Sequence, residues 1–163
     1  MNEGAKRAGG DILLFLHADT FLPQDAFPMI RSVLENKRVS AGTFFLGIDH
    51  PSVTFRFIEW GTNLRSSFTR IPYGDQGLFL RKEVFESIGG FAEIPLMEDI
   101  EIAKRLKKEG EIIFVREPVL TSPRRWLKEG AFYTTIRDWA IALAFTVFHV
   151  SPEKLSRYYR DAR

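Results

Sequence analysis

The feature that most constrains the fold is the alternation of short apolar runs with helical periods along the chain. Residues Ile12 to Leu16 form a continuous apolar run, as expected for a strand that is buried on both faces. A pattern of helical period follows from Pro23 to Asn36, with Ala26, Ile30 and Leu34 on one face. This alternation predicts an α/β fold, in which layers of helices cover a sheet.

The same patterns predict the remaining elements. Strands are expected at residues 41–48, 77–80 and 112–115, and helices at 53–68, 82–88, 99–109 and from 124 onward, with a break at Ser151 and Pro152. A chain of 163 residues suits a single domain with one sizeable core.

Composition excludes several functional classes. The chain has no cysteine, which rules out disulfides, thiolate metal sites and cysteine nucleophiles, and which fits a reducing cytoplasm. Its 23 basic and 21 acidic residues are nearly balanced, so nucleic acid is not the expected partner. We find no signal peptide and no apolar run of about 20 residues, and we therefore expect no transmembrane helix and a cytoplasmic location.

Two polar residues follow the first predicted strand. His17 and Asp19 stand where open α/β sheets place their ligands, just beyond the carboxyl end of a strand. A carboxylate at this place can ligate a divalent cation that neutralises a diphosphate, and an imidazole beside it would suit Mn²⁺ better than Mg²⁺. Taken alone, the pattern fits better with Asp19 capping a turn beside a hydrogen-bonded His17.

Glu98 and Asp99 stand at the start of the helix predicted at 99–109. A carboxylate at this position can act as a general base toward an acceptor hydroxyl. Acidic residues also stabilise helix N-termini, and in isolation this capping role is the favoured interpretation.

Two further segments combine residue types that bind sugars and phosphates. Gly74, Asp75 and Gln76 could form a loop against a bound sugar, or a plain turn. Arg124, Arg125 and Trp126 could clamp a diphosphate while the indole stacks on a ring. The equal alternative is a basic helix start with Trp126 in the core.

The order of these segments resembles family 2 glycosyltransferases of the GT-A type. The E-D and S-x-x-R-W elements are similar to the T-E-D and Q-x-x-R-W elements of that family. Within it the chain resembles the small bacterial group of rSAM/selenodomain-associated transferases 2, in five ordered segments that cover nearly the whole chain. These segments are Leu13 to Thr20, Ile58 to Ser66, Pro72 to Phe79, Ile94 to Asp99 and Ser122 to Trp126.

The resemblance implies a fold and a chemistry. The fold would be a GT-A-like, Rossmann-like nucleotide-diphospho-sugar transferase fold with C-terminal helices. The activity would be the metal-dependent, inverting transfer of a sugar from a nucleotide-diphospho-sugar donor to an unidentified acceptor.

The resemblance also implies residue roles. Asp19 would bind Mn²⁺ or Mg²⁺, with His17 where many relatives carry a first Asp. Asp99 would be the catalytic base and Glu98 its neighbour. The substrate-binding residues would be Gly74, Asp75, Gln76, Arg124, Arg125 and Trp126.

Members of this family begin with a strand-helix-strand unit that holds the nucleotide base, and the resemblance implies that this unit is missing here. Residues 1–123 would then form a GT-A core without its first βαβ unit, and residues 124–163 a C-terminal helical region. We expect either a truncated gene or an internal Met1 that was taken as the start. The alternative function is a non-catalytic, truncated glycosyltransferase that acts as a dimeric or partner-binding module.

The C-terminal region has an apolar stretch from Trp139 to Val150 and a basic tail from Lys154 to Arg163. Two interpretations carry equal weight. The region could lie on the inner membrane face, which would suit a lipid-linked or apolar acceptor. It could equally be a docking helix or a homodimer contact.

Overall fold

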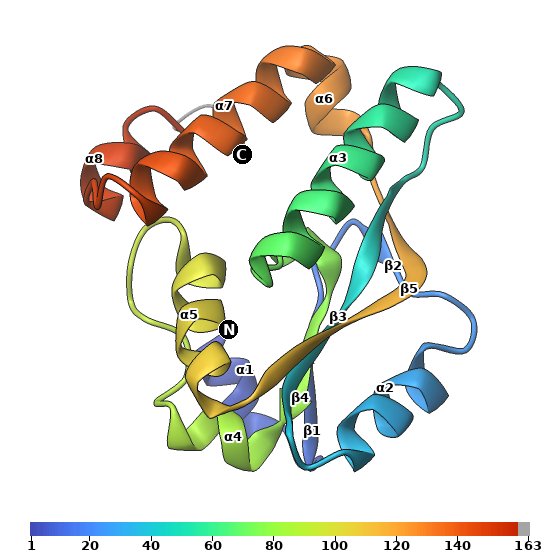
Figure 1. Cartoon of the computed structure of the whole chain (residues 1–163), viewed down its shortest axis with the longest axis vertical. Coiled ribbons are helices and arrows are strands. Elements are labelled where there is room, and N and C mark those ends of the chain that lie inside the picture. Colours follow the sequence, from blue (N-terminus) through green and yellow to red (C-terminus); the bar gives the residue numbers. More distant parts are fainter. Residues whose placement is uncertain (160–163) are drawn as a thin grey trace.

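The computed structural model describes residues 1–159, which form an α/β fold around a curled, mixed sheet of five strands (Figure 1). The strands lie in the order β1-β4-β3-β5-β2. They are β1 (Ile12–Phe15), β2 (Thr20–Phe21), β3 (Val39–Ile48), β4 (Leu78–Arg81) and β5 (Glu111–Thr121). Only β3 and β5 are parallel, and the other pairs are antiparallel. The predicted α/β class is therefore confirmed.

The helices follow the predicted periods closely. They are α1 (Asn2–Arg7), α2 (Ala26–Glu35), α3 (Val53–Thr69), α4 (Lys82–Ser87), α5 (Glu98–Glu109), α6 (Arg124–Glu129), α7 (Ala131–Thr146) and α8 (Pro152–Ser156), with a 3₁₀ turn η1 at Gly74–Gln76. Only the short α1 and β2 have no counterpart among the predicted elements. The last four residues of the predicted basic tail lie outside the described residues.

Helices cover both faces of the sheet (Figure 1). On one face, α2 packs against β3 and β4, and Ile30 and Leu34 join a cluster with Phe44 and Phe79. On the other face, α1, α4 and α5 supply a second cluster around Leu80. A third, smaller cluster joins α3 and α6 to the far half of β3.

Strand β1 is an edge strand, and the predicted run Ile12 to Leu16 is corrected in two details, the exposure of Ile12 and the end of the strand at Phe15. Its side chains do reach both core clusters, with Leu13 and Phe15 in one and Leu14 in the other. However, Ile12 is exposed, and within residues 1–159 only β4 pairs with this strand. The apolar pattern reports which faces are covered, but it carries no information about whether a neighbouring strand is present.

Strand β5 extends six residues beyond the end predicted at Val115. The pairing with β3 shifts register between Phe44 and Phe45, so that Arg116 and Glu117 are skipped and Pro118 pairs beyond them. A β-bulge of this kind tolerates proline in a strand. The extension matters because it carries Thr121 and Ser122 to β2, directly beside Asp19.

Helix α3 takes the place of a neighbouring strand along the outer half of β3. Strand β4 pairs with β3 only at Gly42, and beyond that point the backbone of Leu46 bonds to a side chain of α3 instead. The Leu46 N–H donates to Oδ1 of Asn63 at 2.8 Å, and Nδ2 of Asn63 donates to the Leu46 carbonyl at 2.9 Å. These bonds satisfy buried backbone groups that would otherwise be unpaired, and they fix α3 against the sheet.

Within residues 1–159, none of the helices combines the length and the apolar character needed to span a bilayer.

Candidate active site

A cavity of about 1100 Å³ opens where the end of β1, the loop around η1, the start of α5 and helix α6 meet. Nine of the ten site residues predicted from the sequence line it, although they come from segments up to about a hundred residues apart. They are His17, Asp19, Gly74, Asp75, Glu98, Asp99, Arg124, Arg125 and Trp126. The tenth, Gln76, is not among the lining residues.

Asp19 is placed by the short pairing of β2 with β5. Thr20 is paired with Thr121, and their hydroxyls are 3.1 Å apart. The Ser122 N–H donates to the Asp19 carbonyl at 3.1 Å. As a result, Oδ2 of Asp19 lies 3.7 Å from Nη2 of Arg124, at the cavity mouth. The first and the last predicted motifs are therefore neighbours in space.

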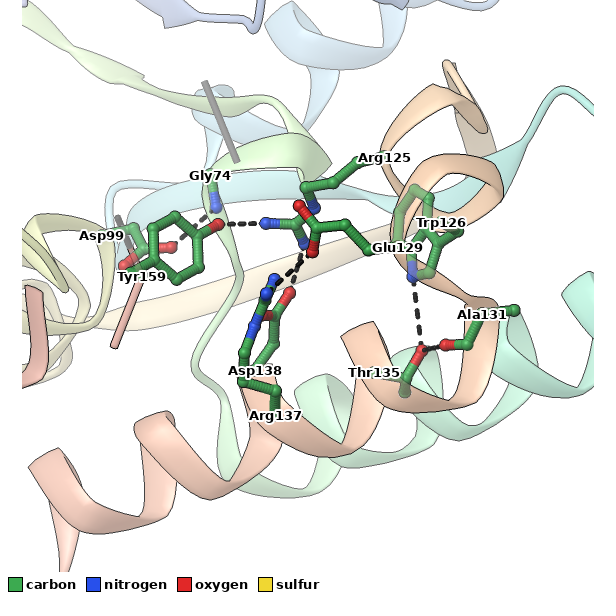
Figure 2. A network of polar contacts seen from close by, with 10 residues as sticks. All are labelled: Gly74, Asp99, Arg125, Trp126, Glu129, Ala131, Thr135, Arg137, Asp138 and Tyr159. Carbon is green, nitrogen blue, oxygen red and sulfur yellow. Dashed lines mark hydrogen bonds and ion pairs between the residues drawn. The ribbon is translucent and has the colours of Figure 1, made fainter. Parts of the chain in front are cut away.

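Asp99 is held by backbone donors at the first turn of α5. Its Oδ2 accepts from the Gly74 N–H at 2.9 Å (Figure 2). Its Oδ1 accepts from the Ile100 N–H at 2.7 Å. The residue at the N-cap, Met97, has a φ of 69°, which is unusual for a residue with a side chain and is typical of strained functional sites.

The pKa of Asp99 is raised to about 6. Burial is the main cause, and the nearby carboxylates of Glu98 and Asp75 raise it further, while the bonds from Gly74 and Ile100 lower it. A carboxyl with a pKa near 6 holds a proton much more strongly than an ordinary aspartate and is still ionised at neutral pH. These are the properties of an efficient general base.

Asp75 is the second carboxyl in the cavity wall whose pKa is raised by burial. The charges of His17, Arg125 and Arg65 act in the opposite direction. Its Oδ1 is buried and accepts no hydrogen bond within the part of the chain that the structure describes. A carboxylate oxygen that is buried without a partner is costly for the folded protein.

Gly74 allows His17 and Asp99 to approach the same loop. A methyl group at Gly74 would lie 2.8 Å from Nε2 of His17 and 3.8 Å from Oδ2 of Asp99. The histidine ring therefore packs directly over the Gly74 backbone, whose N–H holds Asp99. Any side chain at this position would displace the imidazole.

Gln76 lies inside the protein, with 0% of its surface exposed. Its Oε1 accepts from the Ser66 hydroxyl and from the Tyr73 N–H, both at 2.9 Å, and its Nε2 donates to the Phe44 carbonyl at 3.3 Å. In this structure its amide therefore ties the loop around η1 to α3 and β3 and does not face the cavity.

Arg125 is bound by two residues that sequence reasoning missed. Its guanidinium donates to the Asp138 carboxylate of α7 and to the Tyr159 hydroxyl (Figure 2). Burial raises the pKa of Asp138, and Arg125 is the main opposing influence. No local pattern identifies Asp138 or Tyr159, because their relation to Arg125 arises only from the fold of α6 to α8.

Trp126 packs in the core, as one of the two alternative predictions has it, and it also lines the cavity. Its ring is 7% exposed, packs edge-on to Phe55 and donates from Nε1 to the Thr135 hydroxyl at 3.3 Å (Figure 2). It thus belongs to the core, and it also forms part of the cavity wall.

Among residues 1–159 no three His, Asp or Glu side chains come together in a way that could hold a metal ion. The two residues predicted as metal ligands, Asp19 and His17, both line the cavity. A Mg²⁺ or Mn²⁺ ion that acts on a nucleotide usually takes one or two protein ligands and completes its shell with water and phosphate oxygens. The pair fits a site of that kind, and it does not fit a metal cage built by protein alone.

Neither a scan of the chain against protein-family models nor a search of the curated proteins found a match. The assignment of a function therefore depends on the arrangement of side chains around the cavity.

Proposed function

We propose that this chain is an inverting glycosyltransferase with a GT-A-like core, which moves a sugar from a nucleotide-diphospho-sugar to an acceptor hydroxyl. One observation supports the proposal: a carboxylate suited to act as a general base and residues suited to bind phosphate line the same cavity. Asp99, with a pKa of about 6, lines the same cavity as Arg124, Arg125 and Asp19. Proton transfer from the acceptor and release of an anionic leaving group require both kinds of residue in one site.

In the proposed reaction Asp99 takes the proton of the acceptor hydroxyl. The acceptor oxygen forms a bond to the anomeric carbon as the bond from that carbon to the diphosphate oxygen breaks. The electron pair of the broken bond leaves with the nucleoside diphosphate. Direct displacement of this kind inverts the configuration at the anomeric carbon.

Arg124 and Arg125 differ in how freely their side chains can move toward a bound diphosphate. Arg124 is exposed, and within residues 1–159 its guanidinium has only the 3.7 Å contact with Asp19, so it can turn toward a diphosphate. Arg125 is already held by Asp138 and Tyr159, so it contributes a fixed positive charge at a defined place. Preorganised charge of this kind stabilises a leaving anion without reorganisation during the reaction.

A divalent cation would be held by Asp19, with His17 as the second protein donor. Once bound, it would supply Lewis-acid neutralisation of the diphosphate. Asp75 lines the same cavity, and in the proposed complex its carboxylate would accept a hydrogen bond from a donor-sugar hydroxyl.

The test of the proposal is a thermal-shift series with UDP, GDP, CMP and their sugars, each with and without Mn²⁺, on the wild type and on Asp19→Ala. A ligand that binds only the folded state raises the melting temperature. We expect one nucleotide to raise it in the presence of Mn²⁺ and the shift to disappear in Asp19→Ala. A folded sample that responds to none of these nucleotides would contradict the proposal.

A second candidate is the non-catalytic, dimeric or partner-binding module, which is favoured by one observation. Strand β1 pairs on one side with β4, and no strand among the described residues pairs with its other side. An open strand edge is a template for pairing with another chain. A concentration-dependent dimer by light scattering, together with no response to nucleotides, would favour this candidate.

A further inference from the structure

Helix α3 exposes a row of apolar side chains on the face turned away from the sheet. Its members follow one another at intervals of three or four residues and are between 54% and 90% exposed. They are Val53, Phe57, Trp60, Leu64 and Phe68. The opposite face of α3, with Phe55 and Ile58, is buried against β3. A helix that is apolar on two faces needs two surfaces to cover it.

Helix α7 and the residue after it carry a second row with the same spacing. Its members are Phe132, Ile136, Trp139, Leu143 and Val147, between 39% and 70% exposed. The inner side of this helix is again occupied, by Thr134, Ile141 and Ala142. The pattern on α3 is therefore repeated on a helix about eighty residues away in the sequence.

The two rows belong to one surface. Helices α3 and α7 contact each other at the same end of the molecule (Figure 1). A methyl group at Gly61, which follows Trp60 on α3, would lie 3.2 Å from the ring of Trp139. The two helices therefore approach each other at Gly61 and Trp139, and we call the ten residues of the two rows the α3–α7 face. Apolar patches of this extent are rare on monomeric soluble proteins and mark interaction sites.

Exposed charge is unevenly distributed around this face. In residues 53–70 and 124–159 the exposed charged residues are six basic and one acidic. They are Arg56, Arg70, Arg124, Lys128, Lys154 and Arg157 against Glu153. Over the remaining described residues the balance is reversed, with eight exposed basic and eleven exposed acidic residues. The segments that carry the apolar rows therefore have an excess of exposed cations, of which Arg56 is paired with Glu59 and Arg124 with Asp19, while the other described surfaces are slightly acidic.

We infer that the α3–α7 face binds the surface of an anionic lipid bilayer, with its apolar rows in the interfacial layer and its cations on the lipid headgroups. The combination of apolar side chains with flanking Lys and Arg is the pattern of helices that lie in the plane of a membrane. Two of the three tryptophans of the chain stand on this face, and tryptophan is enriched at the boundary between hydrocarbon and headgroups.

A second copy of the chain fits this face less well. A two-fold dimer would place the same surface on both sides of the contact, since such interfaces are isologous. The excess of exposed cations in one copy would then face the same excess in the other, with only Glu153 of each copy as an exposed acidic residue in these segments. Anionic lipid offers both an apolar layer and the opposite charge. The inference does not depend on the proposed function, because neither row contributes to the cavity wall, although two of the cations, Arg124 and Lys128, also line it.

The experiment is flotation of the whole chain with vesicles of phosphatidylcholine, alone or with about one third phosphatidylglycerol, at low and at high salt. We expect binding to the phosphatidylglycerol vesicles, weakened more than tenfold when salt is raised from about 0.05 M to about 0.5 M. Tryptophan fluorescence should shift to the blue on binding, because Trp60 and Trp139 leave water.

Two variants with matched controls test the two parts of the face. Phe57→Ala/Phe68→Ala should weaken binding at least about tenfold, while Phe21→Ala/Phe27→Ala, two equally exposed rings on β2 and α2, should not. Lys128→Gln/Lys154→Gln should weaken binding by about 25-fold, or about fivefold for each cation, while Lys37→Gln/Lys108→Gln should have little effect.

Three results would overturn the inference. The first is no binding to either kind of vesicle, and the second is equal binding to both. The third is a dimer by light scattering that Phe57→Ala/Phe68→Ala converts to monomer, which would assign the face to a second copy.

Discussion

Soluble proteins usually bury apolar side chains and expose polar ones. The cavity wall and the α3–α7 face depart from this pattern in opposite ways. Around the cavity, polar groups are withdrawn from water, with Asp75 and Asp99 shifted in pKa by burial. On the α3–α7 face, ten apolar side chains are left in water. A buried polar group and an exposed apolar patch are the informative exceptions to the usual burial pattern.

Helix α3 shows the same contrast within one element. On its inner face, the side-chain amide of Asn63 forms hydrogen bonds with both the N–H and the carbonyl of Leu46. Its outer apolar residues, such as Phe68, contact little of the protein and are strongly exposed. Inner residues should therefore determine stability, while outer and cavity residues should determine binding and chemistry.

The largest effect is expected at the cavity. Asp99→Asn should lower the rate of nucleoside diphosphate release from the donor by about 10² to 10⁴-fold, because the base is lost. The wild-type rate should rise with pH through about 6, as Asp99 loses its proton. Glu109→Gln, at the other end of α5, is the control and should keep the wild-type rate. An Asp99→Asn enzyme with the wild-type rate and pH profile would remove Asp99 from the chemistry.

The next effect concerns the inner face of α3. Asn63→Ala should lower the free energy of unfolding by about 2 to 3 kcal/mol, because it leaves two buried backbone groups of Leu46 unpaired. Urea unfolding measures this, with Ser67→Ala on the exposed side of the same helix as control. A loss equal to that of Ser67→Ala would show that α3 does not take the place of a strand beside β3.

The pH dependence of stability tests the burial of Asp99 directly. Its pKa is about 6 in the folded protein and has an ordinary value of 3.8. The folded state binds this proton more tightly, so the stabilisation is complete below pH 3.8 and is lost as the pH rises through about 6. The free energy of unfolding of the wild type, relative to Asp99→Asn, should fall by about 1 to 3 kcal/mol between those values. A difference that does not change with pH would mean that Asp99 titrates normally.

The smallest effect is expected on the α3–α7 face. Phe57→Ala/Phe68→Ala should change the free energy of unfolding by no more than about 0.5 kcal/mol, because both rings are already in water. Phe55→Ala, on the buried face of α3, should cost about 3 kcal/mol or more by the same measurement. A large loss in the exposed pair would show that the outer row is structural and would weaken the contrast between the two regions.

Periodicity predicted most of the elements, because helices and strands leave local, repeating patterns. It predicted the end of β5 wrongly at Val115, since a bulge depends on the partner strand and not on the local pattern. It also missed the outer row of α3, because an aromatic-rich helix gives the same pattern whether its second face is covered or exposed. The motifs around Asp19, Asp75, Asp99 and Arg125 were found by residue type, while Asp138 and Tyr159 have no local signal.

The sequence by itself determined the α/β class, the approximate limits of the helices and the identity of nine of the residues around the cavity, because these depend on short-range periodicity and residue chemistry. Only the tertiary structure decided that β1 is an edge strand, that Gln76 is buried and that Asp19 stands beside Arg124. It also decided the raised pKa of Asp99, since desolvation and the approach of Gly74 depend on residues far away in the chain. Contacts between distant segments set burial, and burial sets the chemistry of the groups it encloses.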